Sequence, residues 1–171
     1  MNRTDQSGPL PSSTIEEALE RIVHDWKPCS ALLLGPTALA RWAQLELDGK
    51  PQVVIVPELS RGTLPPDTGR FDLVFVRGLM ERHDRETGGR LLGALRDLHA
   101  GILLVEICQE RGEDSDDWAL SEMLAYGFRR MVTLAEPTGD VALYRFSLFD
   151  YKQTPDWLNP DSWAHPHRWK P

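Results

Sequence analysis

Four short apolar runs, separated by segments with helical periodicity, constrain this fold more than any other feature of the sequence. The runs are residues 31–34, 53–56, 71–76 and 102–105, and the second consists only of β-branched residues. Runs of this length indicate strands that are buried on both faces. Strands that alternate with helices form a mostly parallel sheet with helices on both sides. The sequence therefore predicts an α/β fold.

The segments between the runs carry apolar residues at helical spacing. Thr14 and Glu17 have the spacing of a capping box and predict a helix over residues 14–27, which ends at Pro28 because proline cannot continue the hydrogen-bond ladder. Three more helices are expected: from Thr37 to Asp48-Gly49, across Leu91–Leu98, and from a cap at Ser115 or Asp116 to Gly127.

The last two apolar segments, residues 128–135 and 141–149, are joined by five residues at 136–140. A connection this short can join only antiparallel neighbours. The predicted parallel sheet therefore ends in a C-terminal antiparallel hairpin. Residues 59–70 are rich in Gly and Pro and are expected to form a loop.

Composition limits the domain organisation and the function classes. A chain of 171 residues fits one domain of ordinary size, for which we expect boundaries at 13–150, preceded by a disordered leader at 1–12 and followed by a Trp-rich strap at 151–171. The net charge of −7 argues against a general nucleic-acid binder. Without an 18-residue apolar run or the apolar region of a signal peptide, we expect a soluble cytoplasmic protein.

The two cysteines are expected to be free thiols. Cys29 precedes one predicted strand and Cys108 follows another, which places them at opposite edges of a parallel sheet. A disulfide requires Cα atoms within about 7 Å of each other. Two cysteines are also too few for a cysteine-rich zinc site.

Several segments, taken in order, resemble one superfamily. Tyr126-Gly127-Phe128 before the final hairpin, the phrase at 69–74 and the segments at 79–83, 91–95 and 101–105 resemble the class I S-adenosylmethionine-dependent methyltransferase fold. The tail at 156–169 resembles the ending of a small group of uncharacterised bacterial proteins with a truncated methyltransferase-like domain. The resemblance implies a Rossmann-like sheet, S-adenosylmethionine as cofactor and methyl transfer as activity.

The sequence departs from that superfamily in two places. The family has a glycine-rich turn after the first strand, usually behind an acidic residue, whereas here Leu33 and Leu34 precede a turn in which Gly35 is the only glycine. Between Val53 and Phe71 there is room for one strand and a loop, so one strand-helix unit is missing. Glu58 is the nearby substitute for the acid that the family uses to bind the ribose.

Ligands of open α/β sheets bind beyond the carboxyl ends of the strands, where the strand order reverses. No residue there is marked as a catalytic base. The alternative to a ligand site is that Gly35 only forms a tight turn and that Glu58 is a solvated surface carboxylate. The candidate cofactor-binding residues at this edge are Gly35, Pro36, Thr37, Glu58, Arg77 and Gly78, with Glu106–Gln109 following the fourth run.

Other ligand motifs are weak or absent from the sequence. A P-loop and the G-x-G-x-x-G dinucleotide fingerprint are both missing. The acidic run from Glu110 to Asp117 could hold a hard cation, but it is more typical of a solvated loop before a helix, and we predict no metal. His24, His83 and His99 are isolated along the chain, so a surface or core role is expected for each of them in preference to catalysis.

The tail carries three evenly spaced tryptophans, Trp157, Trp163 and Trp169. Exposed together, their indoles would form a larger apolar patch than a monomer normally tolerates. They are expected either to cover the protein's own sheet or to dock on a protein partner or a second copy. Two function hypotheses follow: a methyltransferase-like protein of unknown substrate, with a cofactor site that has degenerated in part, or a non-catalytic interaction module with the same fold.

Overall fold

The computed structural model describes residues 14–49, 51–110, 118–136 and 139–148. The predicted leader at 1–12 and the Trp-rich strap at 151–171 lie outside these residues. Their boundaries remain predictions.

The described residues form one six-stranded sheet in the order β2-β1-β3-β4-β6-β5. Strands β2, β1, β3 and β4 are parallel, and β6 and β5 form the antiparallel end. This confirms the predicted α/β class and its C-terminal hairpin. The strands are β1 (Ser30–Leu34), β2 (Gln52–Val56), β3 (Phe71–Arg77), β4 (Ala100–Glu110), β5 (Arg129–Glu136) and β6 (Gly139–Ser147).

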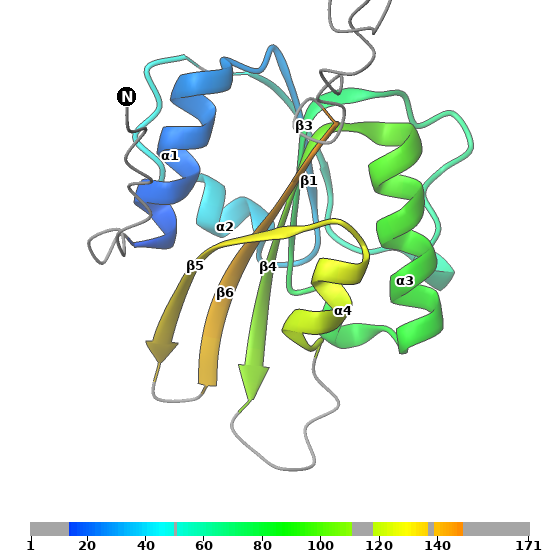
Figure 1. Cartoon of the computed structure of the whole chain (residues 1–171). Coiled ribbons are helices and arrows are strands. Elements are labelled where there is room, and N and C mark those ends of the chain that lie inside the picture. Colours follow the sequence, from blue (N-terminus) through cyan, green and yellow to red (C-terminus); the bar gives the residue numbers. More distant parts are fainter. Residues whose placement is uncertain (1–13, 50, 111–117, 137–138, 149–171) are drawn as a thin grey trace, which may run out of the picture.

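Helices cover both faces of the sheet, as predicted (Figure 1). On one face, α1 (Ile15–Trp26) and α2 (Ala38–Trp42) pack against Leu33, Phe75 and Leu104. The other face is covered by α3 (Arg85–Ala94), which continues as one π-helical turn (Leu95–His99), and by α4 (Leu120–Ala125). The two layers of buried side chains account for the apolar character of both faces of β1, β3 and β4.

The first helix begins as its sequence predicts. The Thr14 hydroxyl accepts from the Glu17 backbone N–H at 3.1 Å, and the Glu17 carboxylate accepts from the Thr14 N–H at 3.1 Å. This is a complete capping box. Lys27, just before Pro28, ends the helix in a left-handed conformation with φ of 45°.

The second helix is shorter than predicted, because a tertiary contact overrides the helical periodicity of its sequence. The helix after Thr37 ends at Trp42 rather than at Asp48-Gly49. The Glu46 N–H donates to the Glu20 carboxylate of α1 at 2.7 Å instead of continuing a helix. Leu45 and Leu47 still pack against the core, although from a non-helical segment.

The predicted caps of the last helix are also wrong. The residue before α4 is Ala119, not Ser115 or Asp116, which lie outside the described residues. The Glu122 carboxylate accepts from the Ala119 N–H at 2.8 Å. A side chain from inside the first turn thus satisfies a free amide, so a polar residue at the cap is not needed. Gly127, with φ of 87°, follows the helix end as predicted.

The strand at 53–56 is not buried, contrary to the sequence prediction. It lies at the edge of the sheet with β1 as its one neighbour among the described strands, and Val54 and Ile55 are 40% and 44% exposed. The chain leaves β2 through a loop with a 3₁₀ turn (Ser60–Gly62) and then enters β3, which agrees with one strand-helix unit fewer. An apolar β-branched run does not distinguish a central strand from an edge strand.

Cys29 and Cys108 are both free, as predicted. Cys29 precedes β1 at the amino-terminal edge, and Cys108 lies near the carboxyl end of β4. None of the helices in the described part of the chain is long and apolar enough to cross a membrane.

Candidate functional site

The carboxyl edge of the sheet is the place to examine first, because the strand order reverses there between β1 and β3. β1 ends at Leu34 and β3 ends at Arg77. Five of the six predicted site residues follow these two strand ends: Gly35, Pro36, Thr37, Arg77 and Gly78.

The structure brings these five residues into direct contact at the place where the strand order reverses. A Cβ on Gly35, whose φ is 104°, would overlap the Arg77 carbonyl oxygen, and a Cβ on Gly78 would lie 2.7 Å from the Thr37 hydroxyl and 3.6 Å from the Pro36 ring. The Thr37 hydroxyl donates weakly to the Arg77 carbonyl at 3.5 Å. The two loops that follow β1 and β3 therefore pack on each other at the point where a crevice was predicted.

Arg77 extends this contact sideways along the edge. Its Nη1 donates to the Thr37 carbonyl at 3.1 Å, and its Nε donates to Oε1 of Glu106 at 2.6 Å. Arg77 thus links the β1 turn to β4. Because Glu106 is only 3% exposed, its carboxylate depends on this partner for its charge to be stable in the interior.

Two helices complete the ion-pair network. Arg41 of α2 donates to the same Oε1 of Glu106 at 3.1 Å and also pairs with Glu16 of α1. The network Glu16–Arg41–Glu106–Arg77 therefore connects α1, α2, β4 and β3. Glu106 Oε2 and Arg41 Nε are buried without a hydrogen-bond partner, so the network is not fully satisfied.

The sequence did not indicate Arg41 or Glu16 as members of this edge. Both belong to helices, and long charged side chains of a helix usually face solvent. Arg41 directly precedes the apolar Trp42, and this signal is too weak to predict an ion pair with a residue 65 positions further along the chain.

Glu58, the sixth predicted residue, follows the end of β2, where the Val56 carbonyl accepts from the Gly35 N–H at 3.0 Å. The Glu58 side chain is 79% exposed and its Oε1 is 3.8 Å from Nη1 of Arg82. An exposed pair at this distance contributes little. The predicted amide-rich helix start at Thr37 is also reduced, because α2 has only five residues and Thr37 makes no side-chain cap.

The groups whose pKa is shifted lie outside this edge. Backbone and hydroxyl hydrogen bonds from Thr87 lower the pKa of Asp84 at the start of α3, and the hydrogen bond from Arg96 lowers that of Asp97. Burial raises the pKa of Tyr144. These shifts accompany capping, a local ion pair and core packing, not an acid-base pair in a cleft.

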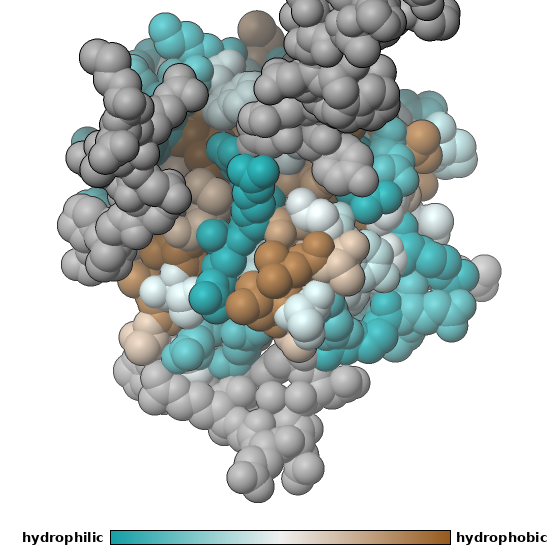
Figure 2. All heavy atoms as spheres, viewed as in Figure 1, coloured by the Kyte–Doolittle hydropathy of each residue, from teal (hydrophilic) through white to brown (hydrophobic). Residues whose placement is uncertain are grey.

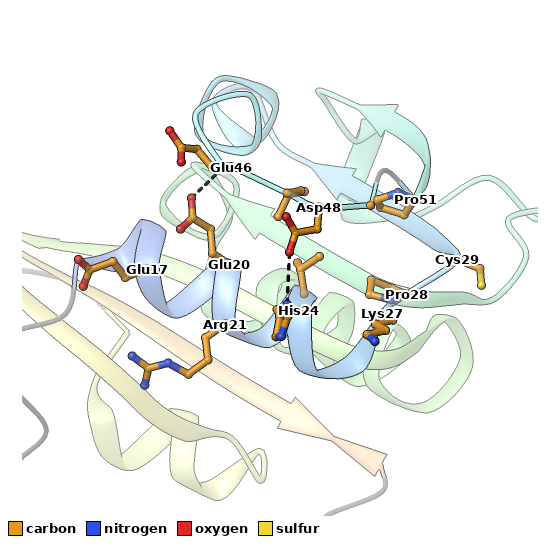
Figure 3. Close-up of a pocket in the computed structure, with 13 residues that line it drawn as sticks. Glu17, Glu20, Arg21, His24, Lys27, Pro28, Cys29, Glu46, Asp48 and Pro51 are labelled. Atoms are coloured by element: carbon orange, nitrogen blue, oxygen red, sulfur yellow. Dashed lines mark hydrogen bonds and ion pairs between the residues drawn. The ribbon is translucent and has the colours of Figure 1, made fainter.

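Two hollows lie at the opposite, amino-terminal edge. The larger, of about 900 Å³, runs along α1, residues 46–49 and Pro51 (Figure 3). Two of its acidic side chains have partners there: the Glu20 carboxylate accepts from the Glu46 backbone N–H, and Asp48 is 3.7 Å from His24 Nδ1. The smaller hollow, of about 420 Å³, is lined in part by Trp26, Phe71 and Ile102.

The surface seen in Figure 2 mixes hydrophilic and hydrophobic side chains, with a hydrophobic cluster over α4, where Leu124 is exposed.

In the part of the chain that the structure describes, no three His, Cys, Asp or Glu side chains gather as a metal site. His24, His83 and His99 belong to separate elements, and His99 is held by the Gly69 carbonyl at 3.0 Å. The acidic residues at 111–117 lie outside the described residues.

Comparison with solved structures defines the class of fold. The methyltransferase domain of a bacterial CtHen1 is similar with a TM-score of 0.50 and 10% identity, over 78% of this chain and 97% of that domain. The Burkholderia thailandensis 1,6-didemethyltoxoflavin-N1-methyltransferase, solved with S-adenosylhomocysteine, is similar with a TM-score of 0.50 and 14% identity, over 77% of this chain and 78% of the enzyme. The chain has a methyltransferase-like fold.

Residues 13–171 match DUF6231, a family of unknown function, and the chain belongs to that family. The match extends to the last residue, so it includes the Trp-rich tail. None of the curated proteins is significantly similar to this sequence.

The turn after β1 does not fit the cofactor that the fold implies. In the methyltransferase superfamily a glycine-rich turn lets the cofactor approach the backbone. Here the Arg77 carbonyl packs directly against Gly35, the single glycine of that turn, and the Thr37 hydroxyl packs against Gly78. The protein's own backbone therefore fills the space beside the turn. Glu58, the substitute for the ribose-binding acid, is 79% exposed and lies 3.8 Å from Arg82.

Proposed function

We propose that this chain is a non-catalytic protein with a methyltransferase fold, which acts through its surfaces and not through S-adenosylmethionine. The contact between the Gly35–Thr37 turn and the Arg77–Gly78 backbone carries the proposal. Opening this edge for a cofactor would separate two packed loops and move Arg77 away from the buried Glu106.

The buried ion pair between Arg77 and Glu106 supports the same proposal. A carboxylate that is 3% exposed loses much of its stabilisation when one of its two arginines is withdrawn. A ligand would have to offset that loss through its own contacts. Of the family's two cofactor features named above, the turn is filled by the protein's own backbone, and only the exposed carboxylate of Glu58 is left to provide such contacts.

Isothermal titration with S-adenosylmethionine and S-adenosylhomocysteine tests the proposal. We expect no saturable heat up to about 1 mM ligand, where binding would be worth only about 4 kcal/mol. A methyltransferase that binds the product serves as the positive control in the same buffer. A dissociation constant in the micromolar range would contradict the proposal.

The competing hypothesis is a methyltransferase that binds S-adenosylmethionine through Gly35, Thr37 and Glu58. The fold supports it, since the toxoflavin enzyme with that fold holds S-adenosylhomocysteine. Under this hypothesis the titration gives saturable heat that Glu58→Ala weakens, because that carboxylate would bind the ribose. A matched control is Glu86→Ala, which removes an exposed carboxylate on α3.

The Trp-rich tail is the proposed binding element, through Trp157, Trp163 and Trp169. Its support is the aromatic composition, which favours interfaces, together with a family match that includes the tail. Truncation after Tyr151 is expected to leave the thermal unfolding midpoint within about 2 °C of the full chain. A large decrease in the midpoint, or aggregation, would instead make the tail part of the fold.

A further inference from the structure

The smaller hollow at the amino-terminal edge has an aromatic lining. Trp26, the last residue of α1, is 36% exposed, and Phe71 at the start of β3 is half-buried. The buried Ile102 of β4 adds to the apolar surface. A volume of about 420 Å³ is within the range of small-molecule sites. The hollow therefore has room for a small ring system, and its side chains are of the kind that pack against one.

Two cationic side chains, Lys27 and Arg70, line the same hollow, and both are exposed. Lys27 follows the last residue of α1, and Arg70 directly precedes β3. Nη2 of Arg70 donates to the Ala100 carbonyl at 3.2 Å, which restricts where the guanidinium lies. An ammonium and a guanidinium both form strong, charge-assisted hydrogen bonds with carboxylates.

The acidic side chain that lines this hollow, Asp72, already has partners. Its Oδ2 accepts from the Cys29 N–H at 2.8 Å, from the Ser30 N–H at 3.0 Å and from the Ser30 hydroxyl at 3.2 Å. Three donors on one oxygen offset part of its negative charge. The residues that line the hollow thus carry two cations against one carboxylate that is already bonded, and they favour an anionic ligand over a cationic one.

The backbone of Lys27 occupies a conformation that favours glycine. With a φ of 45°, Lys27 is the one non-glycine residue with a positive φ in the described part of the chain. Its N–H donates to the Val23 carbonyl at 2.9 Å and so ends α1. Glycine would form the same cap without strain. The lysine therefore adds a charge at the hollow and makes the end of the helix less stable, as is common for residues at binding sites.

We propose that the smaller hollow binds a small aromatic carboxylate, whose ring packs against Trp26 and Phe71 and whose charge is held by Lys27 and Arg70. The ring gains from burial against the two aromatic side chains. The carboxylate accepts hydrogen bonds from the two cations. This hollow lies at the opposite edge of the sheet from Gly35, so the proposal goes beyond the proposed function and can fail separately from it.

Indole-3-carboxylate is the probe for this site, because it carries one ring system and one negative charge. Titrated into the full chain and followed by amide NMR, it should give saturable shifts at Phe71, Gly101 and Ile102 with a dissociation constant of about 0.1–1 mM. Indole, which lacks the charge, and tryptamine, which reverses it, should each bind at least about tenfold more weakly. No saturation up to about 10 mM probe, or equal binding of tryptamine, would overturn the proposal.

Variants of the two cations distinguish a ligand site from a structural role. Lys27→Gly should raise the urea midpoint and still weaken binding of the probe about fivefold or more, a combination that a purely structural lysine would not give. Arg70→Gln should weaken binding to a similar extent, whereas Arg70→Lys keeps the charge and should stay within about threefold. The control Arg90→Gln removes an exposed cation of α3 that does not line the hollow, and it should leave binding unchanged.

Unchanged binding in both Lys27→Gly and Arg70→Gln would contradict the proposal. So would nuclear Overhauser contacts between Ile102 and an indole of the Trp-rich tail in the chain without probe, because the protein's own tail would then be the occupant of the hollow.

Discussion

Gly35 is the residue whose substitution reports most directly on the closed carboxyl edge. Its φ of 104° disfavours any side chain, and a Cβ would overlap the Arg77 carbonyl oxygen. Gly35→Ala is therefore expected to lower the free energy of unfolding by about 3 kcal/mol or more, measured by urea denaturation.

Gly93→Ala is the matched control. Gly93 lies in α3, where a Cβ would have no atom within 4 Å and where the backbone φ is not left-handed. The substitution should raise the free energy of unfolding by about 0.5–1 kcal/mol, because alanine favours a helix. If Gly35→Ala were as well tolerated as Gly93→Ala, the two loops could not be packed as described.

Arg77→Met tests the ion-pair network at the same edge. The variant leaves the buried Glu106 with Arg41 alone, and we expect a loss of about 1–3 kcal/mol in the free energy of unfolding. The control Arg90→Met removes an exposed pair with Glu86 and should cost less than about 0.5 kcal/mol. Equal effects of the two variants would mean that Arg77 contributes no more than a surface charge.

At this scale the sequence predicted which backbone positions meet but not which side chains. Gly35, Thr37, Arg77 and Gly78 lie at the carboxyl ends of strands that were predicted to be parallel, so their place at one edge could be predicted too. The pairing of Arg41 with Glu106 depends on where a short helix lies over the sheet. Nothing in the local sequence fixes that position.

At the scale of elements, the start of α3 gives a pH-dependent prediction. Asp84 accepts from the Thr87 N–H at 2.8 Å and from its hydroxyl at 2.9 Å, which lowers the pKa of its carboxyl. A carboxyl whose pKa is lower in the folded state stabilises the fold above its unfolded pKa and loses this effect as the pH falls through the folded pKa.

Asp84→Ala should therefore lower the urea midpoint by a constant amount from pH 7 to pH 5. This difference from the natural chain should shrink below about pH 4, the ordinary pKa of aspartate. Asp84→Asn, which caps without titrating, should keep more of the midpoint at pH 7 and follow a flatter pH dependence. A difference that stays constant down to pH 2 would show that the charge of Asp84 has no part in it.

Helices and strands were predictable to the extent that local rules decided them. The capping box fixed the start of α1, and the strand runs matched β1, β2 and β3 within a residue or two. Tertiary contacts decided the rest: Glu20 takes the Glu46 amide and ends the helix early, and β6 pairs with β4 as far as Glu110 and so extends it.

At the scale of the whole molecule, the order of the apolar runs along the chain carried the fold class, and the short connection at 136–140 carried the C-terminal hairpin. The missing strand-helix unit was also predictable, from the length between Val53 and Phe71. Its consequence was not: the loss leaves β2 as an exposed edge, because a strand's burial depends on neighbours that its own sequence does not encode.

We propose that the protein's own contacts close the carboxyl edge to the cofactor. An amide-resolved NMR titration of the full chain with S-adenosylhomocysteine is the decisive test. We predict that the amides of Gly35, Thr37 and Gly78 keep their chemical shifts up to about 1 mM ligand. Saturable shifts of these three amides at micromolar ligand would contradict the claim.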